Sequence, residues 1–238
     1  MPLPDDIQKI IYDYCGRDLA DEEWYANEFN FIKDLALKKR IINEFKSIRF
    51  AYKMYEAIGA KNVNLLFQIR CQILIYASIY EAVLQYVLCT YYNDSEAYIE
   101  MLHHDIPIRI SIPEQKMETL EKVLLHDKKE IFPYFIGKKK KAETSIRFDD
   151  KCRTAEKLNV IGVVKDDKGE VFEDDNGNEI NIAEDIIKIY EYRNGIHIFA
   201  EQRKMIQYEL ELSRKAYRRM RPFIDQIKLS LIRDGKYV

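Results

Sequence analysis

Hydrophobic and polar residues alternate with a helical period along most of the chain. Apolar residues recur every three or four positions over residues 31–58, and this pattern stops at Gly59, a residue typical of helix ends. The next helix is predicted to begin at Asn62 or Asn64 and to run to about Tyr92. It carries apolar residues on nearly every face, which predicts that it lies at the centre of the fold.

Shorter elements are predicted on both sides of this central helix. Capping residues, prolines and β-branched residues indicate where each begins and what it forms. The predicted elements are helices over 5–16, from 21–24 onward, over 97–103 and over 113–125, an extended or irregular segment over 106–112, and a loop over 126–137.

The C-terminal part of the chain is predicted to be helical with one interruption. Asp149 and Asp150 can cap a helix that runs through Leu158. Strand-like pairs separated by Asp-Asp-Lys-Gly and Asp-Asp-Asn-Gly turns predict a small β-hairpin over about 160–180. The elements expected after it are a helix that begins at Asn181 or Asp185 and a long, highly charged helix over about 200–232.

The expected fold class is therefore all-α. We expect an N-terminal helical extension over residues 1–60 and a helical domain over 61–238, with the hairpin as an insertion at about 160–180. The length of 238 residues fits one domain with such an extension.

Composition limits the possible partners and the compartment. The net charge is −2, so binding to nucleic acid would need a local basic patch. None of the four cysteines forms a C-x-x-C pair, and the N-terminus does not resemble a signal peptide, so a cytoplasmic protein is expected. The apolar run over residues 65–92 includes Arg70 and Glu81, which favours a buried core helix over a membrane span.

One segment near the end of a predicted helix has residues suited to RNA cleavage. Arg193 and His197 are four residues apart, which on a helix means about 40° of rotation and ~6 Å of rise, so both project from one face. Asn194 is adjacent. Gly195 can permit a distortion or the close approach of another group, and Asn194-Gly195 can instead be a turn that ends the helix at Tyr192.

These three side chains could cleave RNA without a metal or cofactor. His197 can take the proton of a ribose 2′-hydroxyl or give one near neutral pH. Arg193 can hold two phosphate oxygens, and Asn194 can donate to the same phosphate. One histidine supplies a base or an acid, and a symmetric homodimer would supply the second copy.

Other residues can support this site or belong to the scaffold. Glu81 in the central helix can orient Arg193 through a salt bridge or can be structural. Two basic groups can bind the RNA backbone or can be solvated surface. They are Lys138, Lys139, Lys140 and Lys141, and the cluster of Arg214 and Arg218 with Arg219 and Arg221.

The order of these features resembles the HEPN superfamily over residues 64–232. The segment 78–84 is similar to the signature of its first core helix. Residues 148–151 followed by 155–161 resemble a second conserved segment, and 187–197 resembles the Arg-polar…His motif, although with fewer residues between Arg and His than is usual.

The resemblance implies an up-down helical bundle, a homodimer with facing motifs, and RNA cleavage that leaves a 2′,3′-cyclic phosphate. It further implies a toxin–antitoxin, abortive-infection or antiviral defence role, with an antitoxin or defence protein as a possible partner. Arg193 would bind phosphate, His197 would act as base or acid, and Asn194 would be the polar residue. The alternative is a non-catalytic HEPN interaction module that binds RNA, nucleotide or a protein.

Overall fold

The computed structural model describes residues 2–17, 19–124, 133–166, 168–174, 177–196 and 205–237. Over these residues the protein is mostly helical, with one two-stranded antiparallel sheet. The chain forms two compact units, Met1–Asn93 with Arg147–Val238 and Asp94–Ile146, which we call the helical unit and the ribbon unit. The helices before residue 60 therefore belong to the same unit as the last ones in the chain.

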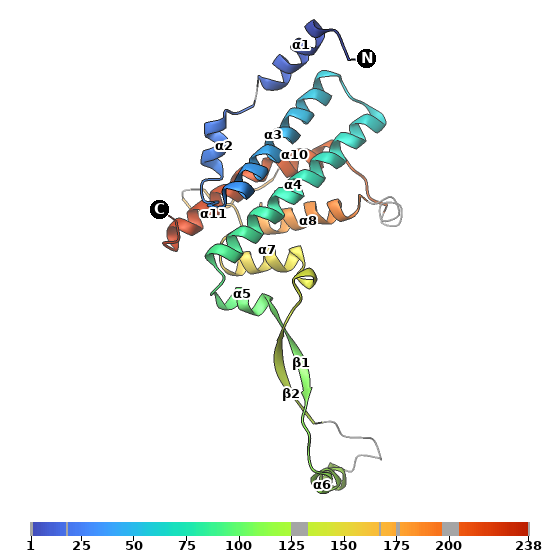
Figure 1. The fold of residues 1–238 in the computed structure, drawn as a ribbon, viewed down its shortest axis with the longest axis vertical. Coiled ribbons are helices and arrows are strands. Elements are labelled where there is room, and N and C mark those ends of the chain that lie inside the picture. The colour runs from blue at the N-terminus through green and yellow to red at the C-terminus, as the bar shows by residue number, and fades with distance from the viewer. Residues whose placement is uncertain are drawn as a thin grey trace. The chain divides into compact units, whose positions relative to one another are not determined.

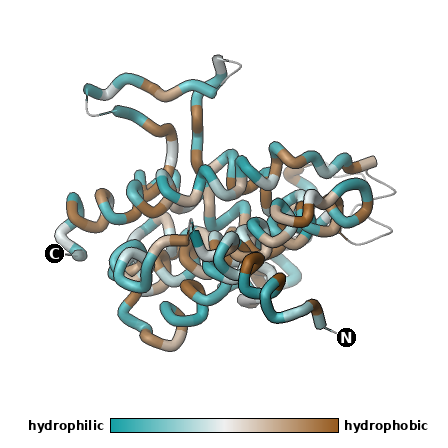
Figure 2. Tube along the Cα trace, turned by 90° about the horizontal axis from the view of Figure 1, so that it is seen from above, coloured by the Kyte–Doolittle hydropathy of each residue, from teal (hydrophilic) through white to brown (hydrophobic). Residues whose placement is uncertain are grey.

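The helical unit contains most of the helices (Figure 1). Polar and apolar residues alternate along them, as Figure 2 shows. They are α1 (Asp5–Gly16), α2 (Glu22–Glu28), α3 (Leu35–Ala57), α4 (Asn62–Tyr91), α7 (Phe148–Lys157), α8 (Ile182–Asn194), α10 (Leu210–Arg218) and α11 (Met220–Arg233).

The capping residues explain several of these helix boundaries. The side chains of Asp21, Asp34 and Asn181 accept hydrogen bonds from backbone N–H groups in the first turns of α2, α3 and α8. Each therefore satisfies donors that have no partner inside the helix. Gly59, with φ of 58°, follows α3 in the left-handed conformation that terminates helices.

Helix α4 is the centre of the helical unit, as its sequence predicts. It packs against α3, α7, α8 and α10, and α3 runs alongside it in Figure 1. The buried Tyr80 hydroxyl donates to the carbonyl of Ala216 at 2.7 Å, which ties α4 to α10. By length and composition alone α4 could cross a membrane, and half of its most apolar window is buried inside the protein.

The prediction of a single helix over 200–232 is wrong within the described residues. The backbone is not helical over 205–209, and Arg219 separates α10 from α11. Pro222 accounts for the break, because it has no N–H for the carbonyl of Arg218 and its ring would clash with that carbonyl.

The predicted hairpin near residues 160–180 consists of short bridges rather than continuous strands. The bridges join Val163 to Asn181, Lys165 to Val171 and Glu173 to Glu179. Within the insertion, Phe172 N–H donates to the Val164 carbonyl at 2.9 Å, and Ile180 N–H donates to the Phe172 carbonyl at 2.8 Å. Three extended segments therefore meet, and Gly169 N–H donates to the Asp166 carbonyl and Gly177 N–H to the Asp174 carbonyl between them.

The ribbon unit contains the described sheet. Its elements are α5 (Glu96–Met101), β1 (His103–Arg109), α6 (Glu114–Leu124), β2 (Tyr134–Lys140) and the short 3-10 helix η1 (Glu143–Ser145). Strands β1 and β2 pair antiparallel, from His103 opposite Lys140 to Arg109 opposite Tyr134. We call them the β1–β2 ribbon.

The ribbon corrects one sequence prediction and confirms part of another. Residues 134–137, expected to be loop, form the start of β2. Residues 106–109, in the segment expected to be extended or irregular, are extended in β1. Most side chains on both strands are exposed, so the apolar-polar alternation that marks a half-buried strand is missing. The pairing partner lies far away in sequence and leaves no local signal.

Candidate functional site

Arg193 lies in the last turn of α8 and is partly exposed. Its Nη1 donates to the Tyr190 hydroxyl at 2.9 Å and to Asn194 Oδ1 at 3.2 Å. The guanidinium carbon also lies 4.8 Å from the centre of the Tyr190 ring. Arg193 and Tyr190 contact each other because they are three residues apart on α8. Arg193 and Asn194, the two residues predicted to bind phosphate, meet at the end of this helix.

Tyr190 connects Arg193 to the central helix. Its hydroxyl donates to Glu81 Oε1 on α4 at 3.2 Å, and Lys151 Nζ on α7 lies 3.9 Å from the same oxygen. The Phe148 ring stacks on the Tyr190 ring with centroids 4.3 Å apart. Burial, followed by the nearby Glu81 carboxylate, raises the pKa of Tyr190, so its hydroxyl stays protonated and can donate.

Glu81 is close to Arg193, as the sequence predicts, but the contact is indirect. Tyr190 stands between the carboxylate and the guanidinium and bonds to both. In the described part of the chain, no carboxylate forms an ion pair with Arg193. Its charge therefore faces neutral hydroxyl and amide oxygens, which leaves it able to bind an anion.

Helix α8 ends at Asn194, three residues before His197. The Tyr192 carbonyl accepts from Gly195 N–H at 2.9 Å and from the Tyr208 hydroxyl at 3.0 Å, so its bonding capacity is filled before α8 can continue. His197 lies outside the described residues. Helix α8 therefore does not continue from Arg193 to His197, and the turn at Gly195 agrees with the alternative in which Asn194-Gly195 ends the helix.

Gly195 is needed where the chain leaves α8. A Cβ atom on it would lie 2.1 Å from Ile206 Cδ1 and 3.2 Å from the Tyr208 hydroxyl oxygen. Gly195 thus allows the segment before α10 to pack closely on the end of α8. The close approach anticipated from the sequence is made by another part of the chain.

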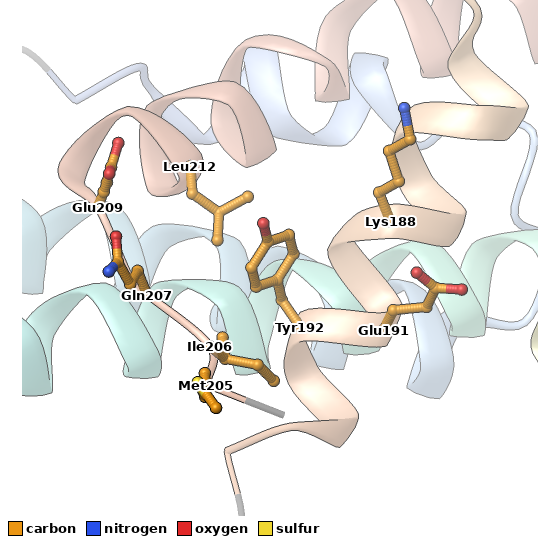
Figure 3. Close-up of a pocket in the computed structure, with 8 residues that line it drawn as sticks. All are labelled: Lys188, Glu191, Tyr192, Met205, Ile206, Gln207, Glu209 and Leu212. Atoms are coloured by element: carbon orange, nitrogen blue, oxygen red, sulfur yellow. The ribbon is translucent and has the colours of Figure 1, made fainter. Parts of the chain in front are cut away.

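A pocket of about 690 Å³ adjoins the end of α8 (Figure 3). Figure 3 shows the Tyr192 ring pointing toward Leu212, with Lys188 and Glu191 along the same helix. None of Arg193, Asn194 and Glu81 lines it, so it is separate from the cluster around Tyr190. The lining residues are Lys188, Glu191, Tyr192, Met205, Ile206, Gln207, Glu209 and Leu212.

The predicted RNA-binding residues lie in both units. Lys138, Lys139 and Lys140 are exposed on β2, and Lys141 follows it in the ribbon unit. In the helical unit Arg218 pairs with Glu211 at 2.9 Å, and Arg214 lies 3.7 Å from the other oxygen of the same carboxylate. These arginines face an acid, which matches the solvated-surface interpretation of their cluster.

Sequence reasoning did not identify Asp185 as the centre of an ion-pair network. Its buried carboxylate lies 2.6 Å from Lys215 Nζ and 2.6 Å from Arg219 Nε. These contacts tie the start of α8 to α10. Arg219, which the sequence placed in a possible RNA-binding cluster, is thus engaged in the core of the helical unit.

Tyr190, Phe148 and Lys151 were also not among the predicted site residues. The spacing of Tyr190 and Arg193 on one helix was an available signal. The sequence held no signal that Phe148 and Lys151 contact Tyr190, because they belong to another helix. No protein-family model matches the sequence, and neither does any curated protein or solved structure.

Proposed function

We propose that the end of α8 forms part of a metal-independent endoribonuclease site in a HEPN-like helical bundle. The observation that carries this proposal is that no carboxylate in the described residues pairs with the partly exposed Arg193. An arginine held by neutral partners retains its positive charge for a phosphate. Asn194, next to it, would contribute an amide to the same phosphate.

In the proposed reaction, His197 removes the proton from a ribose 2′-hydroxyl. The oxygen attacks the adjacent phosphorus, the bond to the 5′-oxygen breaks, and that oxygen receives a proton from the second histidine of a homodimer. The products are a 2′,3′-cyclic phosphate and a 5′-hydroxyl. Arg193 stabilises the charge on the phosphate oxygens as the new bond forms.

This activity would suit a cytoplasmic toxin or antiviral effector that acts as a homodimer. An antitoxin or another defence protein would then control it. Positioning through Tyr190 supports the proposal, because a phosphate ligand must be held in a fixed direction to favour the transition state.

One observation favours the alternative of a non-catalytic module. Helix α8 ends at Asn194, so helical geometry no longer brings Arg193 and His197 together. A module of this kind would use Arg193 to bind the phosphate of RNA or nucleotide without cleaving it, or would bind a protein partner.

The test is incubation of purified protein with mixed RNA in EDTA, followed by analysis of product ends. We expect cyclic phosphate ends with wild type, loss of cleavage in His197→Ala and strong loss in Arg193→Ala. The matched control is His104→Ala, since His104 is exposed on β1, and it should cleave normally. Full cleavage by His197→Ala would refute the catalytic proposal, and RNA binding without cleavage by wild type would support the module.

A further inference from the structure

The two edges of the β1–β2 ribbon differ in their capacity to pair with another strand. Ile110 N–H donates to the Pro133 carbonyl at 2.9 Å, and Lys141 N–H donates to the Leu102 carbonyl at 2.7 Å. Together with the register of the strands, these two bonds show which residues of β1 and β2 direct their backbone groups toward the other strand. The N–H and C=O groups of alternate residues point inward, and those of the residues between them point outward.

Pro107 closes the outer edge of β1. It lies at an outward position, directly opposite Ile136, and has no N–H to offer a neighbouring strand. Proline on an edge strand is a known device against unwanted pairing. The outer edge of β2 has no such block, because Tyr134, Ile136, Lys138 and Lys140 are the outward residues and all have an N–H.

The side chains along β2 would favour a particular kind of strand. Tyr134 and Ile136 are both 59% exposed, and Phe135 between them is 52% exposed on the opposite face. Lysines occupy the other end of the strand at 138, 139 and 140. The edge is therefore apolar at its first half and positively charged at its second half.

The charge on the ribbon is not balanced within its two strands. Asp105 is the single acidic residue of β1 and β2, and it faces Lys138. Lys139 and Lys140 face His104 and His103 instead. In a chain with a net charge of −2, this is the local basic surface that an acidic partner needs.

We propose that the outer edge of β2 binds an extended peptide from a partner protein as a third strand. In antiparallel pairing, the first residues of the peptide lie beside Lys140 and Lys138 and are acidic. Its last residues lie beside Ile136 and Tyr134 and are β-branched or aromatic. Main-chain hydrogen bonds supply affinity, and the side chains supply specificity. This inference does not depend on ribonuclease activity.

Two other occupants fit the edge less well. Tyr134 and Phe135 point to opposite faces of the ribbon, so they do not form one platform on which the bases of an RNA could stack. A second copy of β2, paired antiparallel, would set each lysine cluster beside the apolar half of the other strand and leave the lysines without an acidic partner. An added acidic strand avoids both problems.

The experiment measures binding of a labelled heptapeptide to the full chain by fluorescence anisotropy. The probe has glutamate at positions one and three, valine at five and seven, and threonine elsewhere. A second probe has lysine in place of glutamate. Ile136→Pro places on β2 the block that β1 carries at the opposite position, and its matched control is Ile136→Val, which keeps the N–H.

We expect the acidic probe to bind wild type and Ile136→Val equally, and Ile136→Pro about tenfold more weakly, because an edge hydrogen bond is lost. If Ile136→Pro perturbs the ribbon, Lys140→Glu is the second test variant. Residue 140 faces His103, so the new glutamate meets no acidic residue on β1. It should weaken the acidic probe about fivefold and strengthen the lysine probe.

Three results would overturn the proposal. The first is the absence of binding by the acidic probe at about 1 mM. The second is binding of single-stranded oligouridine, in place of the peptide, that Lys140→Glu abolishes and Ile136→Pro leaves intact. The third is a dimer in sedimentation velocity that Ile136→Pro converts to a monomer, since the edge would then be occupied by a second copy.

Discussion

Arg193 donates a hydrogen bond of 2.9 Å to the hydroxyl of Tyr190, one turn earlier on α8, and that hydroxyl donates to Glu81 on α4. A neutral phenol thus separates a guanidinium from a carboxylate. This relationship orients Arg193 without neutralising it directly.

Tyr190→Phe should remove this link while preserving the ring that stacks on Phe148. We expect the free energy of unfolding to fall by about 1 kcal/mol, because Glu81 and Arg193 lose a common partner in a partly exposed setting. RNA binding or cleavage that depends on Arg193 should also weaken. Chemical denaturation and RNA assays on the same variant measure the two effects.

Tyr192→Phe is the matched control, since Tyr192 is on the same helix and lines the separate pocket. Its unfolding free energy should stay within about 0.5 kcal/mol of wild type. Equal effects of the two changes on stability and on RNA would contradict the positioning role of the Tyr190 hydroxyl.

Asp185→Asn should be among the most destabilising polar changes in the helical unit. Its buried carboxylate pairs with Lys215 and Arg219, and its removal leaves two cations facing an uncharged amide. We expect a loss of about 3 kcal/mol in the free energy of unfolding. Urea denaturation followed by circular dichroism checks this value.

Glu211→Gln provides the comparison, because Glu211 also faces two arginines but is 60% exposed. Solvent screens such a pair, so the loss should be below about 0.5 kcal/mol. A loss as large as that of Asp185→Asn would show that burial does not set the strength of these ion pairs.

Gly195→Ala should destabilise the turn after α8 by about 1–3 kcal/mol, because the new methyl group would overlap with Ile206. Thermal or chemical unfolding measures the loss. Ile206→Val removes the Cδ1 atom nearest to that methyl group. The double variant Gly195→Ala/Ile206→Val should therefore recover part of the lost stability in a double-mutant cycle.

Gly162→Ala is the control, since a Cβ atom there meets nothing within 4 Å. It should leave stability nearly unchanged. Purely additive effects of Gly195→Ala and Ile206→Val would show that the two positions do not meet as described.

Tyr91 and Tyr92 should titrate late and with loss of the fold. Burial raises the pKa of both to about 12, and at Tyr92 the hydrogen bond to Asp234 adds to the rise. The fold favours the neutral phenols, so their contribution is complete below the ordinary pKa near 10 and is lost as pH rises through 12.

Tyrosinate absorbance measured against pH tests this sign. Native protein should show a late phase that Tyr92→Phe reduces, whereas urea-unfolded protein should titrate in one phase near pH 10. Titration of all the native tyrosines near pH 10 would contradict the buried environment of these two phenols.

The sequence by itself determined most helices of the helical unit. The apolar pattern over residues 31–58 and the polar cap at Asn181 predict α3 and α8, and the all-round apolar content of 62–91 predicts a central α4. These signals are readable because a helix forms its hydrogen bonds within four residues, so that periodicity and capping are local properties.

Only the tertiary structure decided the β1–β2 pairing, which of the two predicted courses the chain takes after Tyr192, and how Glu81 is linked to Arg193. His103 pairs with Lys140, Tyr208 donates to the carbonyl of Tyr192, and Glu81 reaches Arg193 only through Tyr190. Each of these contacts joins segments that lie apart in the sequence. Their geometry depends on how those elements pack, and packing is a property of the whole chain rather than of any local pattern.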